Sequence, residues 1–221
     1  NNKNVSVMLS QSPSQIYKSQ LRGHEENEDY RCLSTFNYGL YYEESRKPFG
    51  YITAINDETL APQQSHSFTT KSNESIILMP LAGTIDYKDR IGNKNYLATE
   101  EIQILKVAEP TLFEISNPYE KELINYLQIR LNSKSDSISF EKFQFNFNKK
   151  NELSVLLENE NYKISIGLFT GRSEGVYTLK DKSRGIFTFI INGAFEFENR
   201  LLESRDALAI WDISKIEFEA L

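Results

Sequence analysis

Apolar residues along this chain alternate with polar residues over short stretches, and glycine, proline and asparagine separate these stretches. The alternation is strict at residues 143–147, and the β-branched run at residues 51–55 ends at Asn56-Asp57. A period of two residues is that of a β-strand with one buried face. No apolar period of 3.6 residues extends beyond two helical turns, so the pattern predicts an all-β protein.

Two segments, 61–73 and 5–9, need separate comment. Residues 61–73 are polar and are expected to form a loop, whereas the short apolar stretch 5–9 is expected to form an edge strand. Further strands are expected at residues 96–97, 102–107, 123–131, 153–157, 162–169, 175–179, 186–191, 194–197, 207–211 and 216–218.

The chain contains an imperfect internal repeat, because residues 76–89 and 186–199 both run as an apolar strand, a glycine and a second alternating strand. Gly83 and Gly193 each supply a turn with positive φ, and the pattern predicts a β-hairpin in both copies. Two copies imply two similar β-domains, each a double-stranded barrel. The polar segment 132–137 lies between the copies and is the expected linker. We therefore predict domains at residues 1–132 and 133–221.

Charge and composition limit the partners of the protein. The chain has 221 residues, 39% of them hydrophobic, with a net charge of −6 and a pI near 5.2. A negative average field repels phosphate, so we expect no direct nucleic-acid partner. No apolar run approaches the ~20 residues that span a bilayer, and no export signal is recognisable, so we expect no membrane association and a cytoplasmic location. The single cysteine, Cys32, agrees with a reducing compartment.

Several separate segments match one known family in the correct order. They are Arg22-Gly23-His24, Ser34-Thr35-Phe36, Phe49-Gly50-Tyr51-Ile52-Thr53-Ala54-Ile55-Asn56-Asp57-Glu58 with Ala61-Pro62, Asp89-Arg90-Ile91-Gly92-Asn93, Asn117-Pro118, Leu127-Gln128-Ile129 and Asp206-Ala207-Leu208-Ala209-Ile210-Trp211-Asp212. With them the chain resembles pirin and the pirin-like bacterial proteins often described as quercetin 2,3-dioxygenases. The resemblance implies a bicupin, two cupin (double-stranded β-helix, jelly-roll) barrels in tandem.

The resemblance also implies a metal site in the N-terminal barrel, where family members bind iron or another divalent transition metal. Two histidines two residues apart hold the metal, together with a later histidine and glutamate, again two residues apart. Counting without gaps places these four positions on Thr69, Lys71, Phe113 and Ile115. A threonine hydroxyl is a weak ligand, an ammonium repels a cation, and the two hydrocarbons have no lone pair. We therefore expect no metal, no cofactor and no catalytic residue, and a ligand pocket at these four positions.

A different alignment brings other side chains into question. His66, Glu74 and Glu114 lie nearest to the ligand positions, but they supply only one imidazole and two carboxylates. Phe113 and Ile115 are two residues apart and should both face the barrel interior, which turns Glu114 outward. We expect His66 in a polar loop and the Lys71 side chain in solvent, with pairing to a buried acid or an anionic ligand as its alternative.

The expected function is that of a pirin-like bicupin that has lost metal-dependent dioxygenase activity and acts by binding a small molecule or a protein. The alternative is a metal-dependent quercetin 2,3-dioxygenase-type oxidoreductase whose ligands lie elsewhere in the chain. A third interpretation, that of a transcriptional cofactor as described for eukaryotic pirin, requires a protein partner because the surface is acidic.

Overall fold

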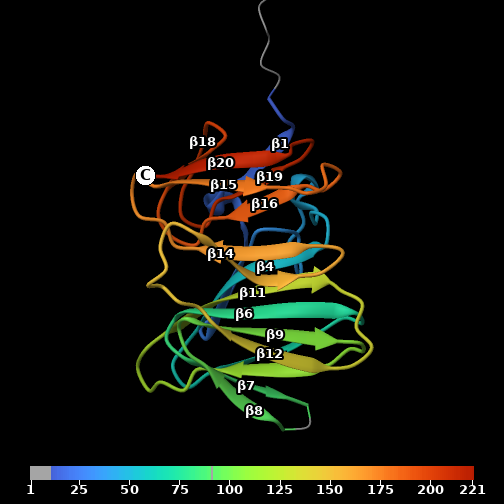
Figure 1. The fold of residues 1–221 in the computed structure, drawn as a ribbon. Helices are drawn as coiled ribbons and strands as arrows, with labels where there is room; N and C mark the ends of the chain where they lie inside the picture. Colours follow the sequence, from blue (N-terminus) through green and yellow to red (C-terminus); the bar gives the residue numbers. More distant parts are fainter. Residues whose placement is uncertain (1–10, 91) are drawn as a thin grey trace, which may run out of the picture. The chain divides into compact units, whose positions relative to one another are not determined.

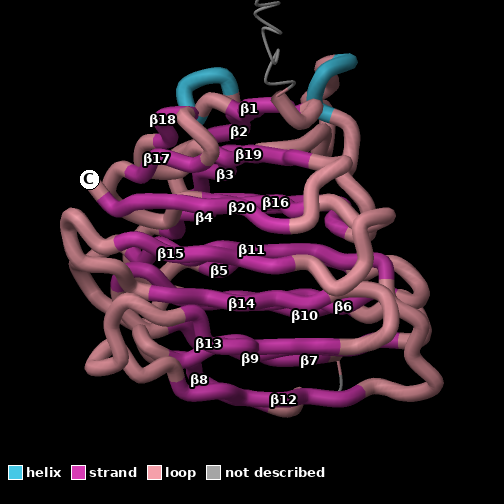
Figure 2. Tube along the Cα trace, turned by 45° about the horizontal axis from the view of Figure 1, so that its top comes forward, coloured by secondary structure: helices cyan, strands magenta, loops and turns pink. Residues whose placement is uncertain are grey.

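The computed structural model describes residues 11–90 and 92–221, and regular structure in them is almost entirely β (Figures 1 and 2). These residues form twenty strands and two short 3-10 helices, η1 (Ser19–Leu21) and η2 (Glu44–Arg46), and contain no α-helix. The all-β prediction is confirmed. The edge strand expected at residues 5–9 lies outside the described residues.

The chain divides into two compact units that differ in size and in continuity. The larger unit is residues 19–170, and the smaller unit combines residues 171–221 with the N-terminal segment up to Lys18. The boundary expected after residue 132 falls inside the larger unit, because the strand that follows it hydrogen-bonds to a strand at residues 101–107. Each unit is described by itself below.

The larger unit contains a seven-stranded antiparallel sheet with the order β12-β9-β6-β11-β4-β3-β2. Figure 1 labels its strands β12, β9, β6, β11 and β4. Its strands are β2 (Gly23–Glu26), β3 (Tyr30–Ser34), β4 (Ile52–Leu60), β6 (Glu74–Ala82), β9 (Glu101–Val107), β11 (Ile124–Asn132) and β12 (Ser139–Gln144). A four-stranded sheet follows the order β5-β10-β7-β8, with β5 (Ser65–Thr69), β7 (Ile85–Asp89), β8 (Lys94–Leu97) and β10 (Leu112–Ser116). A two-stranded sheet pairs β13 (Leu153–Glu158) with β14 (Lys163–Gly167).

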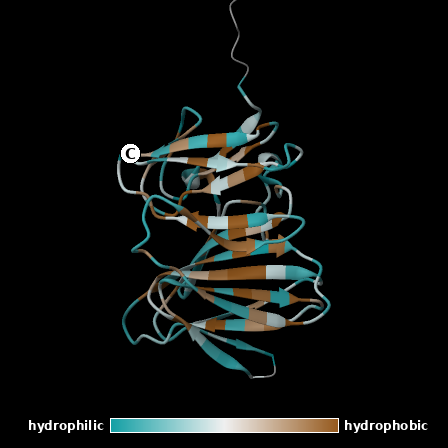
Figure 3. Cartoon of the chain, in the orientation of Figure 1, coloured by the Kyte–Doolittle hydropathy of each residue, from teal (hydrophilic) through white to brown (hydrophobic). Residues whose placement is uncertain are grey.

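One apolar core joins the seven-stranded and four-stranded sheets into the N-terminal barrel. Its buried side chains come from both sheets and include Tyr30, Leu60, Leu78, Leu105 and Tyr126 from the first, and Phe68, Ile85, Tyr87, Phe113 and Ile115 from the second. β6 is hydrophobic along most of its length (Figure 3). A strand buried on both faces reads as a continuous apolar run, which explains why its alternation is weak.

The smaller unit has two antiparallel sheets and includes a strand from the start of the chain. One sheet has the order β1-β19-β16, with β1 (Ser14–Tyr17), β16 (Ile186–Phe189) and β19 (Ala207–Ile210). The other has the order β15-β20-β17-β18, with β15 (Glu174–Thr178), β17 (Phe195–Phe197), β18 (Arg200–Leu202) and β20 (Lys215–Ala220). β1 therefore completes a sheet whose other strands come from the last third of the chain.

The internal repeat is present in the structure, but neither copy is a hairpin. β6 pairs with β9 and β11, whereas β7 pairs with β8 and β10. In the second copy, β16 pairs with β19, whereas β17 pairs with β18 and β20. Gly83 and Gly193 do have positive φ, 78° and 87°. Each glycine thus marks a corner at which the chain leaves one sheet and enters the other.

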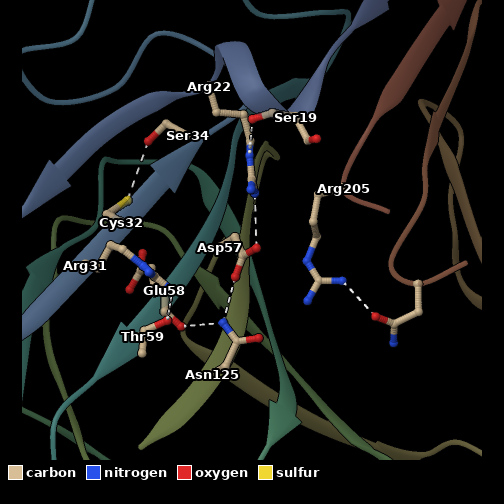
Figure 4. Close-up of polar contacts among 11 residues, drawn as sticks. Ser19, Arg22, Arg31, Cys32, Ser34, Asp57, Glu58, Thr59, Asn125 and Arg205 are labelled. Carbon is tan, nitrogen blue, oxygen red and sulfur yellow. Dashed lines mark hydrogen bonds and ion pairs between the residues drawn. The ribbon is translucent and has the colours of Figure 1, made fainter. Parts of the chain in front are cut away.

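β4 is longer than the sequence predicts and continues through Asn56-Asp57. The prediction that Asn56-Asp57 ends the strand assumes that both side chains are solvated. In the structure both side chains are buried between adjacent strands, so the strand continues. Figure 4 shows Asp57 between Arg22, whose Nη1 lies 3.0 Å from Oδ2, and Asn125, whose Nδ2 donates to Oδ1 at 2.6 Å. The next residue, Glu58, points to the opposite face of the sheet, which lines the barrel interior.

Candidate functional site

Strands β5 and β10 place four side chains opposite one another inside the N-terminal barrel. In their antiparallel register, His66 pairs with Ile115 and Phe68 pairs with Phe113. Phe68, Phe113 and Ile115 belong to the apolar core. Residues two apart on a strand share a face, so the two strands present two facing pairs to the interior. We call His66, Phe68, Phe113 and Ile115 the β5–β10 quartet.

The quartet contains two of the four residues that the sequence assigned to the former metal position. Phe113 and Ile115 are buried on the interior face, as predicted. Thr69 is exposed at the end of β5, opposite the exposed Leu112, and Lys71 is exposed in the turn that follows. The structure therefore brings His66 and Phe68 to Phe113 and Ile115, and leaves Thr69 and Lys71 outside the interior. The inward-facing residues of β5, His66 and Phe68, thus lie three residues before Thr69 and Lys71.

Glu114 lies on the outer face of β10, as predicted. Its Oε1 is 2.7 Å from Nζ of Lys88 on the neighbouring strand β7. A carboxylate between two inward-facing residues cannot reach the interior without a change of register. Glu114 is therefore unavailable to the quartet.

His66 lies on β5 and not in a loop, so the prediction for this residue is wrong. Its imidazole stacks on the phenol ring of Tyr30, with ring centroids 3.8 Å apart and an interplanar angle of 5°. Burial lowers the pKa of His66, and Arg130 acts in the same direction while Glu25 opposes it. The ring is thus held neutral and flat against Tyr30, which is a packing contact between β5 and β3.

Arg130, on β11, lies over an aromatic ring of the quartet. Its guanidinium carbon is 5.2 Å from the centroid of Phe68 and 5.5 Å from that of Tyr38. Nε donates to Oε1 of Gln128 at 2.6 Å, and Nη1 lies 3.5 Å from Oε2 of the buried Glu74. A planar cation between two aromatic faces is stabilised by ring electrostatics and by weak hydration of the guanidinium.

A polar surface on β4 and β11 faces the same interior. Asn56 and Gln128 pair directly in the ladder, as do Glu58 and Tyr126, and all four side chains are buried. Both amide atoms of Asn56, Nε2 of Gln128, Oε2 of Glu58 and the Tyr126 hydroxyl make no hydrogen bond within the part of the chain that the structure describes. Buried polar atoms without hydrogen-bond partners lower the stability of the folded state, so this polar surface destabilises the core.

Glu58 is the carboxyl group of this four-residue surface, and its pKa is strongly shifted. Burial raises its pKa to about 7, and the neighbouring Tyr126 hydroxyl and Arg130 guanidinium offset only part of the rise. Burial also raises the pKa of Cys32, on β3, to about 12, which keeps its thiol protonated at neutral pH. The interior of the barrel thus has an apolar wall at the quartet and a polar wall at β4 and β11.

The donor set of the quartet does not fit a transition metal. His66 supplies one imidazole nitrogen, whereas Phe68, Phe113 and Ile115 are hydrocarbons without a lone pair. The quartet therefore offers a single donor that binds such a cation well. Among residues 11–90 and 92–221, no group of three or more histidine, cysteine, aspartate or glutamate side chains is placed to hold a metal ion. We therefore derive no chemistry from a metal in this barrel.

Sequence reasoning missed Phe68, Arg130 and the buried role of Glu58. A strand composed of Ser65, His66, Ser67, Phe68 and Thr69 has one strongly apolar residue, so β5 reads as a loop. Arg130 follows Gln128 by two residues in a strand that was recognised, and this spacing places both on one face. Two polar residues on the inner face of an otherwise apolar strand were the available signal.

Comparison with known proteins agrees with this architecture. Residues 148–221 match the family described as the quercetinase C-terminal cupin domain. A quercetin 2,3-dioxygenase of Escherichia coli K12 is 21% identical over 215 residues, which cover 93% of each chain. The crystal structure of YhhW from Escherichia coli superposes with a TM-score of 0.82 at 20% identity, over 94% of this chain and 93% of YhhW. Residues 148–221 thus match the quercetinase C-terminal cupin family, and the chain has the bicupin fold of YhhW.

A second structure of that relative, described as bacterial pirin YhhW in complex with nickel(II), matches this bicupin with a TM-score of 0.81 at 20% identity and covers 94% of both chains. The predicted bicupin fold is confirmed, and the similarity of the chain to quercetin 2,3-dioxygenases agrees with the resemblance that the sequence motifs carry. In the described part of this bicupin, no helix has the length and apolar character needed to cross a membrane.

Proposed function

We propose that this bicupin works without a transition metal in its N-terminal barrel, that it has no quercetin 2,3-dioxygenase activity, and that the barrel binds a small organic molecule. The observation that carries the proposal is the composition of the β5–β10 quartet. The family resemblance implies histidine pairs and a glutamate two residues apart on the chain, and the quartet has this spacing on two paired strands. Three of its four members are Phe68, Phe113 and Ile115.

Oxygen-activating metals need several electron-pair donors that converge on the cation and leave open positions for substrate and dioxygen. The quartet supplies the His66 imidazole alone, and this ring is stacked on Tyr30 at 3.8 Å. Phenylalanine and isoleucine side chains cannot be made into ligands by a change of rotamer, because they contain no donor atom. This chemistry supports a barrel that no longer activates oxygen.

The two walls of the interior support a binding role. Phe68 and Phe113 stack with centroids 5.6 Å apart, and the ring of Phe140 meets Phe113 edge-on at 6.4 Å. The polar wall opposite carries amide, phenol and carboxyl groups of Asn56, Tyr126 and Glu58. Small-molecule sites typically combine an apolar lining with a few polar groups that fix orientation. A compact molecule with an aromatic body and polar substituents matches this combination.

A metal-dependent quercetin 2,3-dioxygenase is the second candidate. One observation favours it: the Escherichia coli relative described by that name aligns over 93% of this chain. In this case the metal would have to use donors other than the quartet.

The decisive experiment is to measure metal content and turnover on the same sample. The full chain is incubated with Ni(II), Fe(II), Cu(II) or Mn(II), desalted, and analysed by elemental mass spectrometry and by loss of quercetin absorbance in air. We expect substoichiometric metal and no turnover, while Escherichia coli YhhW treated in parallel takes up nickel. One metal per chain together with quercetin consumption would establish the second candidate instead.

A further measurement separates the two binding roles. Native mass spectrometry of the purified chain is expected to detect a co-purified small molecule that Phe113→Trp, which fills the apolar wall, excludes. A chain with no retained molecule that instead captures a specific protein in a pull-down, unchanged in Phe113→Trp, would make this a protein-interaction module.

A further inference from the structure

Asn192 and Gly193 lie together at the corner between β16 and β17, and both are exposed. The side-chain amide of an asparagine has an electrophilic carbon, Cγ, and covalent geometry alone brings the backbone nitrogen of the next residue within reach of it. A side chain on that next residue hinders the approach, and glycine has none. Residues 192–193 are the only Asn-Gly pair in the sequence. The corner therefore exposes to solvent the asparagine whose neighbour hinders this reaction least.

The loop between β18 and β19 contacts the side-chain oxygen of Asn192. Nη1 of Arg205 donates to Oδ1 of Asn192 at 3.2 Å (the dashed line at Arg205 in Figure 4). The backbone of Arg205 is held in place, because its N–H donates to the carbonyl of Ile190 at 2.6 Å. A guanidinium on an amide oxygen withdraws electrons from Cγ, and it stabilises the negative charge that this oxygen gains when a nucleophile adds. Arg205 therefore polarises the carbon at which the reaction takes place.

The same loop binds the backbone of Gly193. The N–H of Gly193 donates to Oγ of Ser204 at 2.9 Å, and the Ser204 hydroxyl donates to the carbonyl of Gly193 at 3.2 Å. Because its own proton is directed at that carbonyl, the hydroxyl presents a lone pair to the N–H. This hydrogen bond gives the amide proton a route through Ser204 to solvent as the nitrogen becomes a nucleophile. Adjacent residues of one loop thus contact both the electrophilic amide and the attacking nitrogen.

We propose that Asn192 is a site of spontaneous deamidation, which Arg205 and Ser204 promote. The backbone nitrogen of Gly193 forms a bond to Cγ of Asn192 and gives up its proton. The bond between Cγ and Nδ2 breaks, and Nδ2 leaves with that proton as ammonia, so the product is a cyclic imide. Water then opens one of the two imide bonds and leaves aspartate or isoaspartate at position 192. The reaction consumes only water and needs no oxidant, reductant or cofactor.

The two products change the corner in different ways. Aspartate at position 192 offers Arg205 a carboxylate in place of an amide oxygen, which turns the hydrogen bond into an ion pair. Isoaspartate inserts a methylene group into the backbone next to Gly193, whose φ of 87° sets the direction in which β17 continues. The modification therefore acts on the smaller unit, and it is independent of what the N-terminal barrel binds.

The test follows the conversion of amide to acid by peptide mass spectrometry, in the full chain kept folded in mildly alkaline buffer. Asn132 is the internal comparison, because it is also exposed but precedes Ser133, which has a side chain. We expect conversion at Asn192 to be roughly tenfold faster than at Asn132, and at least as fast as in a synthetic peptide of residues 188–197. Slower conversion in the folded chain than in the peptide would show that the fold protects the site, and would overturn the proposal.

Variants of the loop separate its contribution from that of the Asn-Gly sequence. Arg205→Gln removes the charge at Oδ1, so conversion at Asn192 should slow roughly tenfold. Arg184→Gln removes an equal charge from an exposed pair with Asp181 and should keep the wild-type rate. Ser204→Ala should slow conversion roughly threefold, and Ser204→Thr, which keeps the hydroxyl, should restore it. An unchanged or faster rate in Arg205→Gln would contradict the role of the guanidinium and overturn the proposal.

Discussion

Glu58 shows how one residue can make the stability of the barrel depend on pH. Because burial raises its pKa to about 7, the folded chain binds the proton more tightly than the unfolded chain does, whose carboxyl titrates near ~4.3. The stabilisation that results is fully present below the unfolded value and is lost as pH rises to about 7. Glu58 thus destabilises the fold at neutral and alkaline pH relative to acid.

Substitution Glu58→Gln should remove this dependence. Denaturant unfolding of both proteins between about pH 4 and about pH 8 should show the wild type losing about 3 kcal/mol relative to the variant as pH rises. The matched control is Glu114→Gln, whose carboxyl is paired with Lys88 on the outer face. A difference between wild type and Glu58→Gln that stays constant over this range would contradict the assignment.

At the residue scale, the sequence predicts the inner wall of β10 and misplaces that of β5. In β10 the apolar Phe113 and Ile115 alternate with the charged Glu114, so the sequence shows which face of the strand is buried. In β5, Ser65, Ser67 and Thr69 are small and polar and His66 fits either face. The inward face of β5 depends on Phe68 alone, so the pattern of apolar residues does not fix it, and the structure places His66 and Phe68 there instead of Thr69.

The pairing of β5 with β10 predicts that a metal site can be built on the quartet, because its two facing residue pairs lie together inside the barrel. Substituting Phe68→His, Phe113→His and Ile115→Glu together leaves His66 in place and gives three imidazoles and one carboxylate on the quartet. This donor set suits Ni(II) and Fe(II). We expect the triple variant to retain about one nickel per chain by elemental analysis and to unfold at a higher temperature when nickel is present.

The control for this design shifts the first strand back to the positions given by the ungapped count. Thr69→His and Lys71→His combined with Phe113→His and Ile115→Glu place two imidazoles on residues that are exposed. This variant keeps His66 beside the two donors on β10, so the quartet offers two imidazoles and one carboxylate, and it should bind nickel more weakly than the triple variant. Equal nickel content in both variants would refute the register described for β5.

The corner at Gly83 is a second prediction at this scale. The residue has a φ of 78°, and a Cβ placed there would lie 2.9 Å from Cγ2 of Ile124 and 3.0 Å from Cε2 of Tyr119. Gly83→Ala therefore combines left-handed strain with a clash against buried and half-buried neighbours. We expect a loss of about 2–4 kcal/mol in unfolding free energy.

Gly193 is the matched control, because it occupies the equivalent corner of the second repeat with a φ of 87° but has only Phe195 Cε2 at 3.9 Å from the added carbon. Gly193→Ala should cost about 1 kcal/mol, the strain alone. Similar losses for both variants, measured by denaturant unfolding, would show that the clash at Gly83 is relieved.

At the element scale, the sequence predicts the repeat and its glycines correctly but not the partners of the strands. A strand, a glycine and a strand form either a hairpin or a corner, and the local residues are the same for both. The choice depends on distant strands: β9 and β11 occupy both edges of β6, so β7 has to join another sheet. Long-range pairing of this kind is invisible in a single segment of sequence.

For the whole molecule, the smaller unit depends on a strand that is remote in sequence. Tyr17, on β1, is 3% exposed, pairs with Ala207 and packs against the ring of Phe187 at 5.7 Å. The next residue, Lys18, forms an ion pair with the fully buried Asp206. The N-terminal segment therefore contributes both packing and the countercharge to a unit built from residues beyond 170.

Tyr17→Ala should consequently loosen β16 and β19 without a substitution in either strand. We expect a loss of about 3 kcal/mol, seen as faster hydrogen exchange of the amides at 186–189 and 207–210. Ile16→Ala on the same strand is the control, because Ile16 is 41% exposed and its loss should change exchange little. Unchanged exchange in Tyr17→Ala would mean that β1 is dispensable to the unit.

The split composition of the smaller unit has a consequence during synthesis on the ribosome. Residues 19–170 form a continuous unit and can fold as soon as they have emerged, whereas β1 leaves the tunnel first and has no partner until β19 has been translated. Its edge groups stay unpaired throughout that interval, and an unpaired edge invites association with other chains. Slow translation of the last third of the message should therefore lower the yield of native protein. A chaperone that binds the nascent chain would be expected to contact residues 14–17.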